Sequence, residues 1–242
     1  LCYNSQRFRG ELVRVLLIRY TPDPELTIAA SARISASPSP VTEQLEKLTP
    51  QKADQLVAQL ISAGHLSPLE HASFTFSIEG ISRVTSHQLV RHRLASYTQQ
   101  SQRFISLKNL GFVTPPSIKE KPELLALYQQ GVRSSFELYL KLQASGIPAE
   151  DARYLLPSAL ETHIVMTMNA RELLSSAALR LCLKAQWEII QLFEAMKAEV
   201  RKVAPRIGEE MRPKCYKLGY CDEPKSCGLF PTLKETVKPA KL

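Results

Sequence analysis

The spacing of apolar residues predicts a small sheet combined with longer helices. Apolar and polar residues alternate over 72–80 and 159–168, the pattern of a strand with one buried face. A denser apolar run over 11–20 predicts a buried strand. Helical spacing predicts helices over residues 27–37, 50–63, 81–93, 122–144, 170–182 and 184–203, with a short helix from about Pro148.

Residues that favour helix ends mark the boundaries of two predicted helices. Thr49 can cap a helix, Pro50 suits its first turn, and Gly64 ends it. Asn169, followed three residues later by Glu172, resembles a capping box. These signals fix the placement of both helices along the chain.

The elements together predict an α+β fold. We expect a small, mostly antiparallel sheet packed with several long helices in a single domain over residues 1–205. After Pro205 the sequence becomes polar and rich in Pro, Lys and Cys. Residues 206–242 are therefore expected to form a Cys-containing, partly ordered tail.

The segment RHRLASYTQQSQR, residues 91–103, is too polar for a buried element and is predicted to be a loop. Consecutive helical residues diverge by about 100°, so Arg91, His92 and Arg93 should fan out at the end of the preceding helix. Gln88 lies one turn before Arg91 and shares its face. Such a fan suits a ligand, although a solvated basic helix end would have the same sequence.

Ser101 invites a reading as a nucleophile, but no Ser-His-Asp arrangement or G-x-S-x-G elbow surrounds it. The alternative is a hydroxyl that hydrogen-bonds to a phosphate or to the backbone. The neighbouring side chains offer neutral donors and one guanidinium, which suit a phosphate and the edge of a base: Gln99, Gln100, Gln102 and Arg103.

The charge balance favours an anionic partner. Lys and Arg total 31 against 23 acidic residues, a net charge of +8. A basic nucleic-acid-binding protein that uses Arg91, Arg93 and Arg103 on phosphates is therefore an alternative. Against it, the basic residues are spread along the chain and no interleaved aromatic platform occurs. No P-loop or G-x-G-x-x-G is present, so a nucleotide would be held by side chains and helix ends.

No metal is expected from the sequence. The histidine pairs lack the H-E-x-x-H spacing, and no carboxylate-rich cluster joins them. Cys215, Cys221 and Cys227 have C-x5-C-x5-C spacing, but no fourth ligand is evident. Five cysteines in all are best read as reduced thiols, which favours the cytoplasm.

Targeting signals are not apparent. No apolar run approaches the roughly 20 residues of a membrane span, and the first 20 residues contain no signal-peptide core. The chain begins with Leu1 rather than Met, so a leader removed before this point stays open.

Four ordered blocks of sequence resemble the flavin-dependent thymidylate synthases. RHRLASYTQQSQR resembles the family signature of RHR, seven residues and a serine. GHLSPLEHASFTF (64–76) is similar to its G-H-x-[ST]-P-x-E-H segment, and ARYLLP (152–157) to its A-R-x-x-L-P segment. NARELLSSAALRLCLKAQWEI (169–189) is similar to its N-x-R…L-R…A-Q-W-E-I segment. The similarity runs from about residue 10 to residue 205.

The resemblance implies a reaction and its ligands. In this family dUMP, methylenetetrahydrofolate and NADPH give dTMP, tetrahydrofolate and NADP, in homotetramers whose active sites form between subunits around bound FAD. By position, the FAD-binding residues are His65, Ser67, Arg91, His92, Arg93, Gln99, Asn169, Ala170, Arg171 and Ser175. The dUMP-binding residues are Gln88, Leu89, Val90, Arg91, Gln99, Gln100, Ser101, Gln102, Arg103, Arg153 and Arg180. The resemblance implies neither a nucleic-acid nor a membrane partner.

The resemblance also suggests a catalytic residue. Carbon 5 of uracil is a poor nucleophile, and Cys182 is the only cysteine in a matched block. Activation by hydride from reduced FAD is therefore expected rather than by a protein thiol. The Arg180 guanidinium would stabilise the anion formed when ring nitrogen 3 loses its proton.

This chain departs from the family pattern at a few positions. Thr98 and Gln99 replace an Asn-Glu pair that many members have, so an amide stands where they have a carboxylate. Lys184 stands at a position that is often His, and Ser175 where some relatives have Asn. These differences affect single contacts rather than the expected activity.

Overall fold

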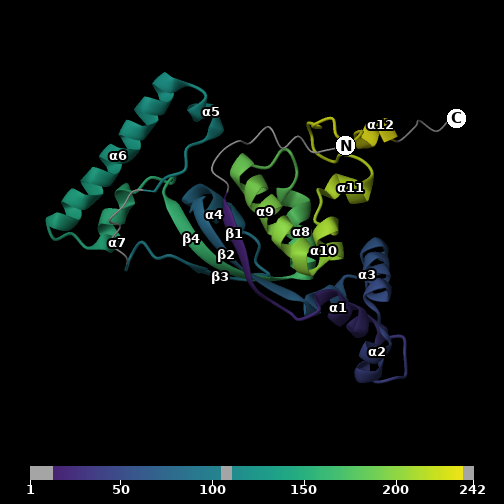
Figure 1. Cartoon of the computed structure of the whole chain (residues 1–242). Helices are drawn as coiled ribbons and strands as arrows, with labels where there is room; N and C mark the ends of the chain where they lie inside the picture. The colour runs from purple at the N-terminus through teal and green to yellow at the C-terminus, as the bar shows by residue number, and fades with distance from the viewer. Residues whose placement is uncertain (1–12, 105–110, 237–242) are drawn as a thin grey trace. The chain divides into compact units, whose positions relative to one another are not determined.

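The computed structural model describes residues 13–104 and 111–236 (Figure 1). Its strands are β1 (Arg14–Tyr20), β2 (Ser73–Ser82), β3 (Ala95–Gln99) and β4 (Glu161–Asn169). The helices before β4 are α1 (Pro24–Arg33), α2 (Val41–Lys47), α3 (Pro50–Ala63), α4 (Arg83–Leu89), α5 (Pro116–Lys119), α6 (Pro122–Ala144) and α7 (Ala149–Ala152). Those after it are α8 (Ala170–Arg180), α9 (Trp187–Val203), α10 (Pro205–Glu210), α11 (Lys214–Leu218) and α12 (Leu233–Thr236). Two 3-10 segments are η2 (Ser67–His71) and η3 (Arg153–Leu155).

The predicted α+β class is confirmed. A four-stranded antiparallel sheet has the order β1-β2-β4-β3. The two alternating segments form its central strands, and their apolar side chains are buried as predicted. These core side chains are Phe74, Phe76 and Ile78 of β2 and Ile164, Met166 and Met168 of β4.

The contacts within the chain define two compact units. Unit 1 comprises residues 1–14, 77–91 and 97–166, and therefore contains α4–α7. Unit 2 comprises residues 15–76, 92–96 and 167–242, and contains α1–α3 and α8–α12. The unit boundaries fall inside all four strands and between Arg91 and His92, so the chain passes several times from one unit to the other.

Each unit has its own apolar core. In unit 1, α6 packs on α7 and η3, and Phe136, Tyr139 and Ala152 form a buried cluster. In unit 2, α9 packs against α8 and α10, as Figure 1 shows, and its Phe193 is fully buried. Burial of such apolar surface is the main source of stability in each unit.

The helix ends follow local rules. Thr49 caps α3 by accepting a hydrogen bond from the Lys52 backbone N–H (3.3 Å), and Gly64 ends the helix at φ +78°. The left-handed conformation at Gly64 favours glycine because it has no Cβ. The predictions for this helix and for the helix over 122–144 are confirmed.

Three predictions about the elements were wrong. The helix expected over 81–93 ends at Leu89, so the RHR motif follows it in a turn. The segment predicted to be a loop contains β3, whose polar residues are tolerated because β3 is an edge strand. The strand expected to be buried, β1, is the other edge, and Leu16 is 50% exposed. Residues 11 and 12 of that prediction lie outside the described residues.

The chain after Pro205 contains three short helices in the described part. Ile207 of α10 is fully buried, and the Arg206 guanidinium donates to Asp54 of α3 at 2.8 and 2.9 Å. The Glu25 side chain accepts the backbone N–H groups of Arg206 and Ile207. The division at residue 205 stays a prediction. Among the described helices, none has the length and apolar character needed to cross a membrane.

Candidate functional site

In unit 1, a polar network joins α4 to β3 and β4. The Ser82 side chain caps α4 by accepting from the Thr85 N–H at 3.1 Å. The Tyr97 hydroxyl donates to the Leu89 carbonyl at 3.0 Å. The Gln99 amide donates to the hydroxyls of Ser86 (3.0 Å) and Thr162 (3.2 Å). Gln99, expected to contact both ligands, is thus held firmly at the end of β3.

Two guanidinium groups of unit 1 lie near one another at the start of the segment 100–103. The terminal nitrogen Nη2 of Arg83 donates to the Gln100 carbonyl at 2.8 Å, while its Nε is buried without a hydrogen-bond partner. The pKa of Arg83 is lowered by burial and by the charge of Arg153. Like charges close together and an unmatched buried donor favour an anionic ligand at this point.

The third guanidinium is that of Arg103, within this segment, and it contacts Glu150 of α7. The Arg103 Nε forms an ion pair with the Glu150 carboxylate, and the Arg153 Nε donates to the Glu150 carbonyl at 3.0 Å. Unit 1 therefore gathers three predicted dUMP-binding residues, Gln100, Arg103 and Arg153. Arg83 was missed, although a cation in the first turn of a helix is unfavourable and can signal function.

Ser101 has a positioning role in the backbone of this segment. Its hydroxyl oxygen accepts the backbone N–H groups of Arg103 (3.1 Å) and Phe104 (3.4 Å). This turn-forming contact fits a hydroxyl that orients the segment and a bound nucleotide better than it fits an activated nucleophile.

We expect Ser101→Ala to retain flavin-dependent turnover while its KM for dUMP rises about tenfold, because one hydrogen bond to an anionic ligand is lost. Steady-state kinetics over a range of dUMP concentrations measures this. Ser145→Ala, at a distant helix end where the hydroxyl donates to Lys141, is the control. Complete loss of turnover with dUMP binding intact would restore the nucleophile reading.

In unit 2, His92 is a buried support for Arg180. The Arg180 Nε donates to His92 Nε2 at 2.9 Å, so the ring proton of the neutral imidazole resides on Nδ1. His92 Nδ1 lies 3.6 Å from the Glu172 carboxylate, and the ring packs near Phe193. Burial and the Arg180 charge lower the pKa of His92 to about 4. The imidazole is therefore neutral at pH 7 and accepts the Arg180 hydrogen bond.

Glu172 is the carboxylate nearest to this pair. Burial raises its pKa, and the Ser176 hydroxyl and the Arg171 charge oppose that shift. The Ser176 hydroxyl donates to Glu172 at 3.3 Å. Glu172, in the first turn of α8, thus lies beside His92, and His92 contacts Arg180 in the last turn of the same helix.

Asn169 and Arg171 lie at the start of α8. The Asn169 side chain caps the helix by accepting the Glu172 N–H at 2.9 Å, as predicted. The Arg171 guanidinium forms an ion pair with Glu70 of η2, and both side chains are about half exposed. This pair connects α8 to the segment that carries Ser67.

We expect Asn169→Ala to lower the free energy of unfolding by about 1 kcal/mol, because one capping hydrogen bond is lost. It should also weaken flavin binding. Thr49→Ala removes the cap of α3 and should lower stability similarly without affecting the flavin. Urea denaturation and flavin titration of both variants check the prediction. Equal flavin affinity in the two variants would contradict a cofactor role for Asn169.

Unit 2 also contains a cavity of about 630 Å³ beside Ser175. This volume is in the range of small-molecule sites. Its walls combine apolar side chains such as Leu66 and Leu174 with Tyr216, one carboxylate, Glu210, and three cations, Arg212, Lys214 and Lys217. Ser175, a predicted flavin-binding residue, lies on the wall of this cavity.

The remaining predicted residues differ in exposure. Arg91 and Arg93 are exposed and His92 is buried between them. Because these residues follow α4 and are not helical, the fan expected from helical geometry is not confirmed. Val90, His65 and Ser67 are exposed, Gln88 and Gln102 are half-buried, and Leu89 and Ala170 are buried. Buried side chains at the last two positions leave the backbone as the group that a ligand would contact.

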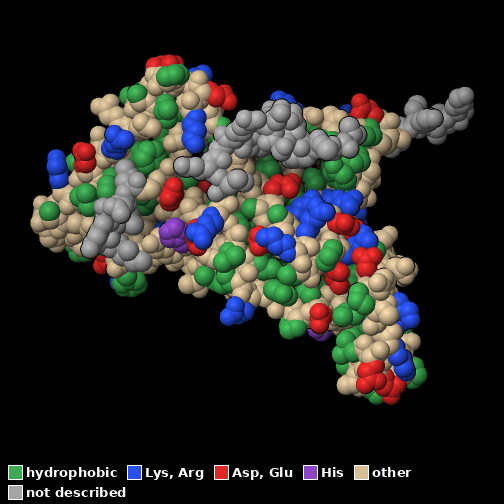
Figure 2. Space-filling model, viewed as in Figure 1, with side chains coloured by type: hydrophobic (Ala, Val, Ile, Leu, Met, Phe, Trp, Pro, Cys, Tyr) green, Lys and Arg blue, Asp and Glu red, His purple; other side chains and the backbone are tan. Residues whose placement is uncertain are grey.

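The basic side chains do not form one continuous stripe on the face shown in Figure 2, where they alternate with acidic groups. Continuous positive surface is the usual footprint of a nucleic-acid-binding protein. This distribution gives no support to that alternative.

Comparisons with known proteins place the chain in a family. The profile of the family described as "Thymidylate synthase complementing protein" matches residues 16–206. The chain belongs to this family of thymidylate synthase complementing proteins, as the sequence resemblance predicted.

The similar relatives carry a more particular name. A flavin-dependent thymidylate synthase of Geobacter sulfurreducens is 44% identical over 213 residues, 87% of this chain and 91% of the relative. One of Pyrococcus horikoshii is 48% identical, covering 88% and 90%. One of Clostridium tetani is 40% identical over 240 residues, covering 92% and 96%.

A solved structure shows the same fold. It is the UMP/dUMP methylase PolB from Streptomyces cacaoi bound with 5-Br dUMP, with a TM-score of 0.75 and 24% sequence identity. The alignment covers 82% of this chain and 94% of PolB. At this identity the likeness concerns the fold alone.

Proposed function

We propose that this chain catalyses the reductive methylation of dUMP to dTMP, with methylenetetrahydrofolate as one-carbon donor and NADPH as reductant through bound FAD. Family membership supports the reaction. The structural observation that carries it is the cluster of Arg83, Arg103 and Arg153 beside the segment 100–103. Three guanidinium groups with Glu150 as the carboxylate in contact leave excess positive charge for a nucleotide phosphate.

The dUMP contacts are proposed for the unit 1 residues of the signature and for Arg180. Arg103 and Arg153 suit the phosphate, with Arg83 as a further donor. Ser101 and Gln100 shape the segment that carries these groups. The other proposed contacts are Gln88, Leu89, Val90, Arg91, Gln99 and Gln102.

The donors of unit 2 fit a flavin dinucleotide. Such a cofactor has a dianionic diphosphate and two flat aromatic ring systems. The 630 Å³ cavity offers apolar walls, Tyr216 and the cations Arg212 and Lys217, with Ser175 at its wall. Arg93 and Arg171 are exposed cations on the same unit. The residues that the family resemblance assigns to FAD are His65, Ser67, His92, Arg93, Asn169, Ala170, Arg171 and Ser175 of unit 2, and Arg91 and Gln99 of unit 1.

When bound, the flavin carries a hydride between NADPH and the nucleotide, which protein side chains cannot do. The protein supplies charge and orientation. Arg180 is the proposed catalytic residue, because its guanidinium can stabilise negative charge on the uracil ring when nitrogen 3 loses its proton. The neutral His92 fixes the guanidinium by accepting the hydrogen bond from its Nε.

We further propose a cytoplasmic homotetramer whose active sites form between subunits. The basis is the family resemblance. Sedimentation equilibrium of the purified protein measures the assembly state, and a monomer at enzyme-assay concentrations would contradict it.

Anaerobic turnover of dUMP with NADPH and methylenetetrahydrofolate, with and without added FAD, tests the proposed reaction. We expect a yellow protein whose flavin absorbance is bleached by NADPH, and dTMP formation that depends on FAD. A colourless protein that forms no dTMP and binds DNA with steep salt dependence would instead support the nucleic-acid-binding alternative.

A further inference from the structure

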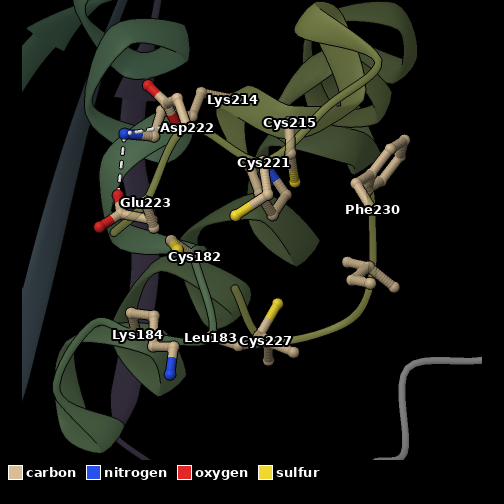
Figure 3. Close-up of a pocket in the computed structure, with 12 residues that line it drawn as sticks. Cys182, Leu183, Lys184, Lys214, Cys215, Cys221, Asp222, Glu223, Cys227 and Phe230 are labelled. Atoms are coloured by element: carbon tan, nitrogen blue, oxygen red, sulfur yellow. Dashed lines mark ion pairs between the residues drawn. The ribbon is translucent and has the colours of Figure 1, made fainter. Parts of the chain in front are cut away.

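Four cysteines from separate parts of unit 2 line one small cavity (Figure 3). Cys182 lies in the loop after α8 and Cys215 in α11, while Cys221 and Cys227 follow in the next loop. The cavity has a volume of about 10 Å³, close to the space that one water molecule needs. Cys182 supplies the fourth thiol that the C-x5-C-x5-C spacing did not reveal.

The thiols surround a common space rather than forming a row. In Figure 3 the side chains of Cys182, Cys215, Cys221 and Cys227 are arranged around the centre of the pocket. All four are free thiols, with Cys215 and Cys221 buried, Cys182 half-buried and Cys227 exposed. Four free thiols from three chain segments around one small cavity are an unusual use of cysteine unless the thiols share a ligand.

With the side chains as they stand, no group of three or more His, Cys, Asp or Glu in the described part of the chain is arranged to hold a metal ion. Each sulfur turns about a single bond among three staggered positions. Coordination therefore requires the sulfurs to turn inward around an ion of about the size of the cavity.

A divalent ion would bind these four groups as thiolates, and its charge would compensate the mutual repulsion of the four sulfurs.

Within the described residues 212–236, called the C-terminal segment here, only Pro213, Cys215 and Cys221 are buried, so little apolar surface holds the segment in place. Its ordered contacts include the short α11, a ring contact between Tyr216 and Phe230 at 5.1 Å, and a bridge between Cys221 and Thr232. Lys214, at the start of α11, forms ion pairs with Asp222 (2.9 Å) and Glu223 (2.8 Å) of the loop that follows the helix. Small segments of this kind are commonly stabilised by a structural metal.

We propose that Cys182, Cys215, Cys221 and Cys227 bind one Zn²⁺ as a tetrahedral tetrathiolate. Four S–H groups lose their protons to solvent, four Zn–S bonds form, and no oxidation occurs. An all-sulfur set of four ligands selects zinc over harder cations and leaves no open position for substrate. The site is therefore structural, and it does not depend on the proposed reaction.

The proposed ion would join the end of α8 to the C-terminal segment. Cys182 is two residues after Arg180, and its carbonyl accepts the Ala185 N–H at 2.8 Å in the turn before α9. The ion would thus fix the loop that follows Arg180 within unit 2.

Metal analysis of the full-length protein tests the proposal. Purified from zinc-containing medium, the protein should hold about one zinc per chain by inductively coupled plasma mass spectrometry. Cys182→Ser and Cys221→Ser should each reduce the zinc content at least about tenfold. Cys2→Ser, at the fifth cysteine, is the matched control and should keep the full content.

A second measurement uses the unaltered protein, in case the variants fold poorly. A mercurial reagent that blocks thiols should release the zinc to a metallochromic dye, and Co²⁺ exchanged into the site should give the visible spectrum of tetrahedral thiolate coordination. Removal of zinc should lower Tm by roughly 5 °C, and re-addition should restore it.

Three results would overturn the proposal. One is full zinc content in both cysteine variants. Another is a metal-free protein whose non-reduced mass is lower by two hydrogens per cysteine pair, which would identify disulfides. The third is iron in place of zinc, with the absorbance of an iron–sulfur centre. Because each readout is a metal or mass measurement, failure here is distinguishable from failure to form dTMP.

Discussion

Arg180→Ala should lose dTMP formation while FAD stays bound. The guanidinium is expected to stabilise charge that develops on the uracil ring, and removal of one such group typically lowers kcat about 10²–10³-fold. His92, one of the proposed flavin-binding residues, would lose the hydrogen bond it accepts from Arg180 at 2.9 Å, while the other proposed flavin-binding residues would keep their contacts. The rate of dTMP formation and the flavin absorbance per chain measure the two effects separately.

Two control variants sharpen this test. Arg180→Lys keeps the charge but not the planar Nε–H donor, so we expect a partial loss. Arg133→Ala removes an exposed arginine of α6 and should leave turnover unchanged. Near-normal turnover in Arg180→Ala would mean that another group stabilises the uracil anion.

The stability of the protein should depend on His92 between about pH 4 and pH 6.5. The folded pKa of about 4 lies below the ordinary value of 6.5, so the unfolded chain binds the proton more readily. The stabilisation is fully present above pH 6.5 and is lost as the pH falls to about 4. The shift corresponds to about 3 kcal/mol in the free energy of unfolding.

The comparison with His92→Gln isolates this contribution. Arg180 and Glu172 face the imidazole, and the variant retains both, so their own titrations largely cancel in the difference. Urea denaturation from pH 4 to 7.5 should show wild type and variant converging toward low pH. His71→Gln, at an exposed histidine of the same unit, is the control for the substitution itself. A wild-type advantage from His92 that stays constant across this range would contradict the buried neutral imidazole.

Local signals were sufficient for the helix from Pro50, the helix over 122–144 and the two central strands. The helix from Pro50 was predicted because Thr49 and Gly64 act within their own turns, and β2 because Phe74 and Phe76 alternate with polar residues. The position of a strand within a sheet depends on distant partners. β1 and β3 lie at the edges of the sheet, and their own sequences could not show these positions.

The candidate site shows the same division. The resemblance placed Arg103 and Arg153 among the dUMP-binding residues, and the structure places both at Glu150. Arg83 was not predicted because its neighbours in space come from other elements. Cys182 was missed as a partner of the C-terminal thiols since more than 30 residues separate it from Cys215. His92 was assigned to the flavin, and its support of Arg180 depends on burial that no spacing shows.

Pro213 and Lys214 line both the thiol-lined cavity and the 630 Å³ cavity. An ion among the thiols that moved Pro213 or Lys214 would therefore change the shape of the larger cavity as well. Linkage then requires that a ligand in the larger cavity change the affinity for the ion by the same factor as the ion changes the affinity for that ligand.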